Sequence, residues 1–388
     1  MDNESRSSVN LRKPIILTSL SAGVMSFLLT IYSKELNMNA IEITGLFSVL
    51  SLVLLIMKPI IGKASDKFGR RPILITAMVG YAIAYGVFSM ADSSIEIYIA
   101  RILQGFAAAL MTISTYAIIS DTTKEENFSE GFGKRSSASS TGILYGIILT
   151  FIVFSSTKFM KAWQILFIIF SLAAIYGAFY VIKKVPETKN GSAFEGEKKK
   201  KLSIDAIKIL IISFITSLGG SILGPIFMIY LLDKFNNDIT LVAYAYIPSL
   251  IIESILSQRI GKFSDNNGKK RSMIIGIIVC GVVTIITPGA NSVIMLAALW
   301  CFSSIGGSLY NLSEQGIYTE VTNEGSRGEM YGVYTMVGNC AGVVGPLIGG
   351  VLYETVSHAA PFYLNGAMMF VVAGLTFVMV KNKYGAVK

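Results

Sequence analysis

Three ionisable side chains, Arg101, Glu253 and Glu314, lie inside long apolar stretches of the sequence. No oppositely charged residue stands within four positions of any of them, so a partner has to come from elsewhere in the chain. A carboxyl group remote from cations in apolar surroundings can take up and release protons near neutral pH. We therefore predict that Glu253 and Glu314 bind protons reversibly. Alternatively, each carboxyl group hydrogen-bonds a serine, such as Ser257 or Ser313, or lies at a hydrated rim.

Arg101 carries a permanent charge, for which the sequence leaves two roles equally open. It neutralises an anionic group of a bound molecule, or it orders its own helix through backbone carbonyl groups and Gln104. Tyr310, Asn311 and Glu314 share one helical face because of their three- and four-residue spacing. Aromatic surfaces with few charges suit an amphiphilic organic molecule, although packing accounts for most aromatic residues in a helical bundle. The further aromatic candidates for a binding cavity are Tyr32, Tyr116 and Tyr230.

The composition of the chain indicates that these stretches lie in a membrane. Apolar residues make up 53% of the chain, charged residues only 15%, and the mean hydropathy is +0.61, which exceeds what an ordinary soluble domain keeps in water. Twelve apolar stretches, one of them beginning near residue 240, are each long enough to cross roughly 30 Å of hydrocarbon as a helix. The first lacks a cleavage signature and is expected to be a retained helix rather than a signal peptide. The sequence predicts an all-α membrane protein with 12 transmembrane helices.

The net charge of +9 indicates membrane topology rather than a nucleic-acid partner. Most of the 33 Lys and Arg residues fall in the two tails and in the loops that lie on the same side of the membrane as the N-terminus. The opposite loops hold only Lys34, Lys158, Lys161 and Lys234. By the positive-inside rule, both termini are expected in the cytoplasm. We expect a multi-pass protein of the plasma membrane, such as the bacterial cytoplasmic membrane, in contact with lipid.

The sequence offers no signature of an enzyme, a metal site or a cofactor site. The three cysteines, Cys280, Cys301 and Cys340, lie inside apolar stretches, and no Cys/His cluster has the spacing of metal ligands. The single histidine, His358, stands near an expected outer loop, and neither a nucleotide-binding phosphate loop nor a nucleophile with a base is present. We expect no disulfide, no metal, no cofactor and no ATP-driven step.

A short polar motif occurs twice in the chain. GKASDKFGRR begins at Gly62, and GKFSDNNGKK begins at Gly261. The same spacing relates Asp121, at the end of one apolar stretch, to Glu320 at the end of another. This repetition predicts two pseudo-symmetric bundles of six helices, an arrangement typical of transporters.

The duplication sets the expected domain organisation. We expect residues 1–184 to form the N-terminal bundle and residues 205–388 the C-terminal bundle. Residues 185–204 are polar, highly charged and without apolar periodicity, which indicates a flexible cytoplasmic linker. Its four-lysine run is better explained as a solvated, topology-setting charge than as a site for anionic lipid head groups.

Two six-helix halves with a Gly-x-x-x-Asp-x-x-Gly-Arg-Arg loop resemble the major facilitator superfamily, and the resemblance covers nearly the whole chain. The residues that match the signature loop of that family are Gly62, Asp66, Gly69, Arg70 and Arg71. The resemblance implies alternating access, in which a central cavity opens to one side of the membrane at a time. The loop then acts as a conformational latch; alternatively, its basic residues only hold the loop in the cytoplasm.

A latch needs contacts that hold one conformation and can also be released. Gly62 and Gly69 are expected to permit the tight turn between two helices. The resemblance implies that Asp66 accepts hydrogen bonds from a helix N-terminus in the other half, and Arg70 is expected to pair with Asp121. Each contact is expected to contribute about 0.5–2 kcal/mol, which leaves both conformations accessible.

Two further patterns bear on the transported molecule. RILQGFAAA, which holds Arg101, Gln104 and Gly105, resembles a pattern common in the drug:proton antiporters of the family. A glycine- and proline-rich antiporter pattern that normally marks the fifth helix appears here in the eleventh. Small residues at this spacing let helices approach closely, so packing and coupling are equally open roles. The residues of this pattern are Gly345, Pro346, Gly349 and Gly350.

The leading hypothesis is secondary active export of an amphiphilic small molecule by alternating access, in antiport with protons and powered by the proton gradient. The alternative is an uptake carrier or facilitator for a polar metabolite such as a sugar or organic anion, favoured if Arg101 meets the substrate and the carboxyl groups do not titrate. A scaffold or membrane enzyme is a third class. We expect a monomer, because one chain contains both halves.

Overall fold

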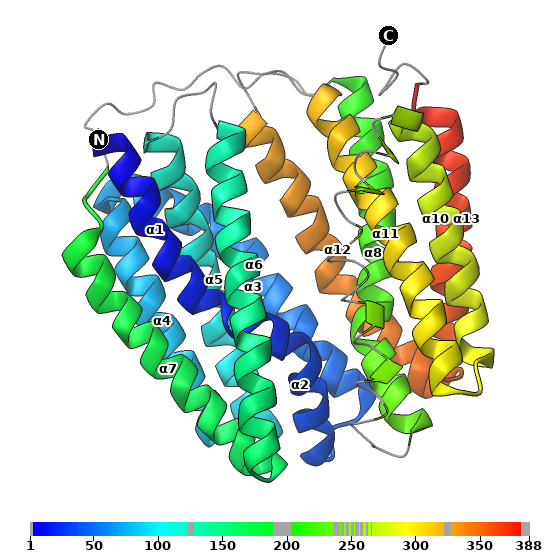
Figure 1. Cartoon of the computed structure of the whole chain (residues 1–388), viewed down its shortest axis with the longest axis horizontal. Helices are drawn as coiled ribbons and strands as arrows, with labels where there is room; N and C mark the ends of the chain where they lie inside the picture. The colour runs from blue at the N-terminus through cyan, green and yellow to red at the C-terminus, as the bar shows by residue number, and fades with distance from the viewer. Residues whose placement is uncertain are drawn as a thin grey trace. The chain divides into compact units, whose positions relative to one another are not determined.

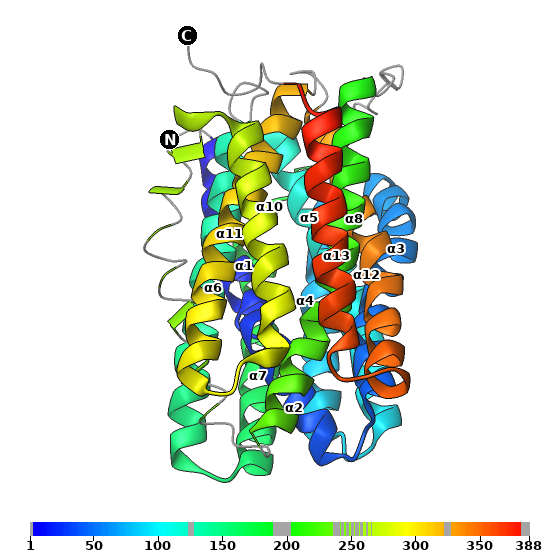
Figure 2. The same ribbon diagram turned by 90° about the vertical axis from the view of Figure 1, so that its right-hand side faces the viewer.

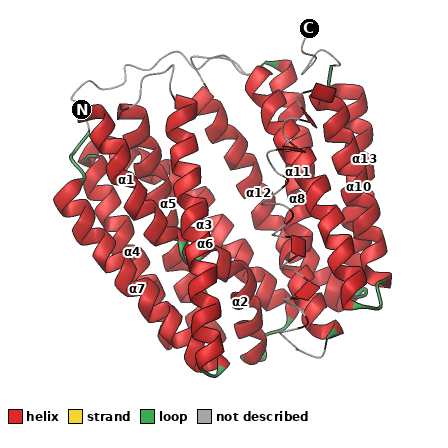
Figure 3. Ribbon diagram, viewed as in Figure 1, coloured by secondary structure: helices red, strands yellow, loops and turns green. Residues whose placement is uncertain are grey.

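The computed structural model describes residues 3–122, 128–188, 203–235, part of residues 241–267, and residues 268–321 and 327–381. The elements in these residues are helices, as the single colour of the elements in Figure 3 shows. One is the 3-10 helix η2 (Thr287–Gly289). The α-helices are α1 (Asn3–Ser19), α2 (Ala22–Glu35), α3 (Ala40–Phe68), α4 (Arg70–Met90), α5 (Ser94–Thr122), α6 (Phe128–Ser156), α7 (Phe159–Lys184), α8 (Ile204–Lys234), α10 (Lys269–Ile286), α11 (Val293–Val321), α12 (Arg327–Thr355) and α13 (Ala360–Met379).

Ten helices in the described residues are long and apolar enough to cross a membrane. The segments Asn10–Met25 and Phe27–Glu35 together qualify as an eleventh span, with a bend of 52° between them. The span expected to begin near residue 240 falls largely outside the described residues. The predicted all-α membrane class is confirmed, while the expected 12 spans are counted as ten or eleven in the described part of the chain.

The outer faces of these helices suit a hydrocarbon solvent. Large apolar side chains are exposed along α6 and α7, among them Leu144, Ile148, Phe151, Leu172 and Phe179. In water, such a continuous apolar surface would promote association. In a bilayer the lipid tails cover it, and the helices satisfy their own backbone hydrogen bonds.

The chain divides into two compact units, Met1–Asn39 with Val49–Glu197 and Ala40–Ser48 with Lys198–Lys388. In the first unit, α4 packs against α5 and α7, and α1 packs against α6 (Figure 1). In the second unit, α10 packs against α11 and α13, and α8 packs against α12 (Figure 2). The same pairs of helices recur in both units, which is the pattern that an internal duplication produces.

An aromatic core holds the first unit together at one end of α2. The rings of Tyr32 and Trp163 stack with centroids 4.0 Å apart and planes 6° apart. Trp163 Nε1 donates to the carbonyl oxygen of Phe88 at 2.8 Å, and the Tyr32 hydroxyl donates to that of Ala91 at 2.6 Å. Tyr32 is only 1% exposed. The structure therefore places this cavity candidate within a packed core.

Glycines allow corresponding helices in the two units to approach at backbone distance. A Cβ atom added to Gly146 of α6 would overlap the carbonyl oxygen of Leu20. A Cβ atom added to Gly349 of α12 would overlap the carbonyl oxygen of Ile222 on α8. Side chains larger than hydrogen do not fit at these positions, so both glycines serve close packing.

The remaining residues of the glycine-proline pattern also lie on α12. A Cβ atom on Gly345 would stand 2.6 Å from Ser221 Cβ, and one on Gly350 would stand 3.0 Å from Ile41 Cα. Pro346 lies inside the helix. The contacts of Gly345 and Gly350 are packing contacts, which account for their small size.

Candidate functional site

Glu314 of α11 is fully buried in the second unit, with 0% of its surface exposed. The Tyr310 hydroxyl, one helical turn earlier, donates to Glu314 Oε2 at 2.6 Å. The Tyr334 hydroxyl, from α12, donates to the same oxygen at 2.9 Å. Glu314 Oε1 accepts no hydrogen bond that meets normal geometry from the described residues. One carboxyl oxygen therefore accepts hydrogen bonds from two phenols, while the other, also buried, is the oxygen that can carry a proton.

Two side chains of α8 complete a cluster around this carboxyl group. Ser213 lies against the Glu314 carboxyl group. The Thr216 hydroxyl forms a short hydrogen bond with that of Tyr310. The ion pairs between described residues do not include Glu314. We call Ser213, Thr216, Tyr310, Glu314 and Tyr334 the carboxyl cluster; it joins three helices through polar groups without a cation.

Two other candidates lie outside the carboxyl cluster. Asn311 is exposed, although the sequence places it on the same helical face as Tyr310 and Glu314. Tyr230, near the end of α8, donates to the carbonyl oxygen of Pro288 at 3.0 Å. Its hydroxyl also accepts a hydrogen bond from Lys234 Nζ at 2.9 Å. Tyr230 thus ties the end of α8 to η2 rather than joining the carboxyl cluster.

Arg101 is 3% exposed in the first unit, and its Nη1 donates to Gln104 Oε1 at 2.7 Å. These residues lie one turn apart on α5. Tyr81 and Tyr85 of α4 lie within electrostatic range of the guanidinium group. The hydrogen bond matches the role in which Arg101 orders its own helix through Gln104.

Tyr116, also on α5, contacts a cation that the sequence did not single out. The Arg135 guanidinium carbon, from α6, lies 4.6 Å from the centre of the Tyr116 ring. This is the geometry of a cation–π contact. In the sequence, Arg135 counts only among the loop residues that set topology, and composition gives no signal that it reaches an aromatic ring.

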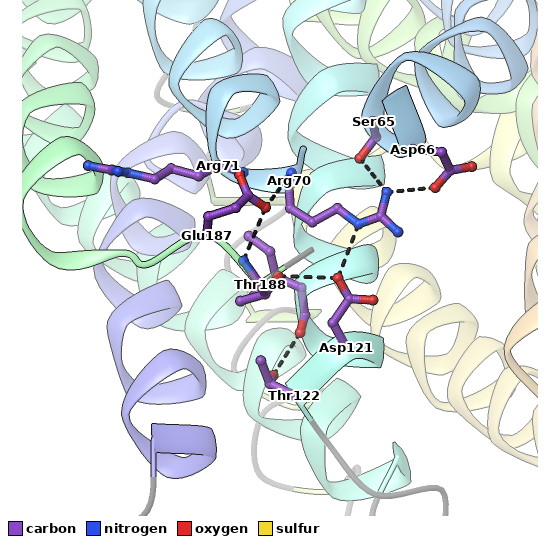
Figure 4. A network of polar contacts seen from close by, with 9 residues as sticks. Ser65, Asp66, Arg70, Arg71, Asp121, Thr122, Glu187 and Thr188 are labelled. Atoms are coloured by element: carbon purple, nitrogen blue, oxygen red, sulfur yellow. Dashed lines mark hydrogen bonds and ion pairs between the residues drawn. The ribbon is translucent and has the colours of Figure 1, made fainter. Parts of the chain in front are cut away.

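The signature loop forms a network around one guanidinium group (Figure 4). Arg70 Nη1 donates to Asp66 Oδ1 at 2.6 Å and to Ser65 Oγ at 3.2 Å, while its Nε donates to Asp121 Oδ2 at 3.1 Å. Arg70 and Asp121 are largely buried, with side chains 11% and 13% exposed, whereas that of Asp66 is 72% exposed. Exposed ion pairs contribute little to stability, so the contact with Asp121 restrains Arg70 more strongly than the contact with Asp66.

A residue beyond α7 completes the network. Glu187 accepts hydrogen bonds from the backbone N–H groups of Arg70 at 2.8 Å and Arg71 at 3.1 Å (Figure 4). Its negative charge therefore lies at the N-terminus of α4, where a helix favours an anion. The Thr188 hydroxyl donates to Asp121 Oδ2 at 3.2 Å. Both residues fall in the expected linker, and polar composition alone does not predict where they dock.

The two glycines of the loop differ in conformation. Gly69 has a φ of +100°, which L side chains rarely adopt, and it begins α4. Gly62 lies within α3, and the space beside it is open. The prediction that both glycines form the turn is therefore wrong for Gly62, because α3 continues to Phe68 before the chain turns.

The second unit repeats this chemistry at the corresponding positions. Gly268 has a φ of +90° and precedes α10, as Gly69 precedes α4. Lys269 Nζ pairs with Glu320 Oε1, where the first unit pairs Arg70 with Asp121. Gly261 lies outside the described residues, as does Glu253, the other candidate for proton binding.

Arg70→Lys is expected to loosen the first turn of α4, because an ammonium group cannot reproduce the planar fork that reaches three side chains. Losing a hydrogen bond between charged groups costs about 1.5–3 kcal/mol, which corresponds to about ten- to hundredfold faster local opening. Amide hydrogen exchange in α4 measures this change. Arg71→Lys is the matched control, since among the described residues the Arg71 side chain donates only to the carbonyl oxygen of Ile182. Equal exchange in both variants would contradict the expected role of Arg70.

The described residues contain no group of three or more His, Cys, Asp or Glu side chains placed to hold a metal ion. Cys280, Cys301 and Cys340 are free thiols. The arrangement can bind a proton at a buried carboxyl group, hold charge beside aromatic rings and stabilise a loop by ion pairs.

Comparison with known proteins gives a consistent result over the whole chain. The model of the Major Facilitator Superfamily matches residues 15–211 and again residues 209–387. The chain is 23% identical to Multidrug resistance protein 2 of Bacillus subtilis, with 98% of this chain and 99% of that protein covered. It is 22% identical to the class B Tetracycline resistance protein of Escherichia coli, with 88% and 87% covered. The crystal structure of the nucleoside transporter NupG superposes with a TM-score of 0.70 at 14% identity, covering 99% of this chain and 100% of that one.

Proposed function

This chain belongs to the major facilitator superfamily, and from that premise we propose that it exports an amphiphilic small molecule in exchange for protons. It is a multi-span membrane transporter and not an enzyme. The observation that carries the proposal is Glu314, a buried carboxyl group that is held by two phenols and has no cationic partner among the described residues.

A carboxyl group couples a proton to a conformation when its two protonation states favour different surroundings. The ionised form of Glu314 is stabilised by the phenols of Tyr310 and Tyr334, which donate to Oε2. The protonated form keeps those bonds and carries its proton on Oε1. Tyr310 and Glu314 both lie on α11, whereas Tyr334 lies on α12, so a change in the packing of α11 against α12 alters the hydrogen bond from Tyr334. Proton binding and helix arrangement therefore influence each other.

The relatives support an amphiphilic cargo. Their names refer to resistance to multiple drugs and to tetracycline. Tyr81 and Tyr85, both buried, place aromatic rings within electrostatic range of the Arg101 charge. This combination suits molecules with both an aromatic and a polar part.

Several further features belong to the proposal. We place both termini in the cytoplasm and the protein in the plasma membrane, and we take a monomer as the functional unit. Residues 1–184 and 205–388 would form the two bundles, joined by residues 185–204. The Arg70 network is then the latch whose release accompanies each transport cycle.

The test uses proteoliposomes with an acidic lumen, a luminal pH dye and a clamped membrane potential. An amphiphile added outside is expected to enter while protons leave, so the luminal pH rises faster than in protein-free liposomes. A panel of amphiphilic drugs and polar metabolites identifies the class of cargo. Uptake of a polar metabolite without any luminal pH change would contradict the proposal and indicate a facilitator.

A further inference from the structure

The first unit contains a lysine within a membrane-spanning helix, four residues before the polar motif that begins at Gly62. Lys58 lies on α3 about ten residues before its end at Phe68, or roughly 15 Å along the axis. It is partly buried. No hydrogen bond or ion pair joins Lys58 to another described residue. A cation at this depth is costly and marks a functional site by default.

A second cation lies within range of Lys58. Arg135 of α6 and Lys58 interact through their charges. Arg135 stacks on Tyr116 at 4.6 Å, and its Nε reaches the Thr115 hydroxyl oxygen at 3.5 Å. Neither contact neutralises the guanidinium charge, and no carboxylate in the described residues pairs with Arg135. Two like charges thus share a partly buried region, where their repulsion is poorly screened.

Arg135 relates these side chains to one another, because Tyr116 contacts it and Lys58 lies within electrostatic range of it. A Cβ atom on Gly105 of α5 would stand 3.0 Å from Val53 of α3, so the two helices touch at that level. Lys58 follows Val53 along α3. Tyr81 of α4 lies within electrostatic range of Arg135, and its hydroxyl forms no hydrogen bond with the described residues. We call Lys58, Tyr81, Tyr116 and Arg135 the basic cluster.

We infer that the basic cluster binds the anionic group, a carboxylate, sulfonate or phosphate, of an amphiphile. The two cations provide the charge, the Tyr81 hydroxyl provides a hydrogen bond, and the Tyr116 ring holds the Arg135 guanidinium group in place. Arg101 is not needed as a direct ligand, because Gln104 already accepts a hydrogen bond from it. This inference rests on the proposed function for its cargo, while the same anionic chemistry is also present in a lipid head group.

The test measures binding of one scaffold in three charge states to the purified full-length protein in nanodiscs of zwitterionic lipid. The probes are 2-naphthoate, neutral 2-naphthamide and cationic 2-naphthylmethylamine. We expect naphthoate to bind at least tenfold more tightly than the amide. Lys58→Gln and Arg135→Gln should each lower the affinity for naphthoate about tenfold and leave the affinity for the amide unchanged. Lys58→Arg should retain naphthoate binding.

Lys63→Gln is the matched control, because it removes the same charge from an exposed position on the same helix. Nanodiscs that contain anionic phosphatidylglycerol distinguish the two sources of the anion. If phosphatidylglycerol competes with naphthoate in a way that depends on Lys58, the basic cluster binds lipid head groups. If phosphatidylglycerol does not compete, the basic cluster binds the cargo. Equal binding of naphthoate and the amide, or equal loss in Lys63→Gln, would overturn the inference. Amphiphile-driven proton movement, measured in proteoliposomes, tests the proposed function separately, so the two can fail independently.

Discussion

Glu314→Gln is expected to abolish substrate-driven proton movement while leaving substrate binding and substrate exchange intact. The amide resembles a permanently protonated carboxyl group: its carbonyl oxygen can accept both phenolic hydrogen bonds, from Tyr310 and Tyr334, but its nitrogen cannot release a proton for transport. Coupling free energies between sites are typically about 1–3 kcal/mol, or about 5- to 150-fold in affinity. The variant should therefore also lose the dependence of substrate affinity on pH.

Three measurements in proteoliposomes separate these effects. Luminal pH reports proton movement, and counterflow of labelled substrate at equal pH reports alternating access. Direct binding measurements report the affinity of the cavity for substrate. Glu96→Gln is the control, because the carboxylate of Glu96 is exposed and accepts hydrogen bonds only at the start of α5. Persistent substrate-driven proton movement in Glu314→Gln would show that another group carries the proton, and Glu253 would become the leading candidate.

Gly146→Ala is expected to destabilise the first unit strongly. A Cβ atom at Gly146 would overlap the carbonyl oxygen of Leu20, and backbone atoms cannot move aside as a flexible side chain can. Overpacking of a closely packed site costs about 1–3 kcal/mol. We expect a lower melting temperature and lower yield of monodisperse protein, as measured by fluorescence-detected size exclusion after heating.

Gly86→Ala provides the matched control on α4, because nothing lies within 4 Å of a Cβ atom there. Alanine is favoured over glycine inside a helix by roughly 0.5–1 kcal/mol, so this variant should be unchanged or slightly more stable. Both variants replace a glycine by alanine, but stability is expected to fall in Gly146→Ala and to stay equal or rise in Gly86→Ala. A Gly146→Ala protein as stable as Gly86→Ala would contradict the close approach of α6 to Leu20.

The amino-acid sequence alone indicates a membrane environment, an all-α fold and an internal duplication. Hydropathy identifies membrane-spanning helices because a segment that crosses hydrocarbon must hydrogen-bond its own backbone groups as a helix and face the lipid with apolar side chains. The repeated loop marks the internal symmetry, which the structure displays in the ion pairs Arg70–Asp121 and Lys269–Glu320. A charge inside an apolar stretch also identified Glu314 as a candidate before any contact was known, because such charges are costly there.

Contacts between side chains of different helices could not be predicted from the sequence. Spacing along one helix relates Tyr310 to Glu314, but Tyr334 reaches the same oxygen from another helix. Composition described the residues after α7 as a linker, whereas Glu187 binds the N-terminus of α4. The physical reason is that hydropathy and periodicity report the environment and face of each residue on its own helix. Partners on other helices depend on how close the backbones come, which packing at sites such as Gly146 determines.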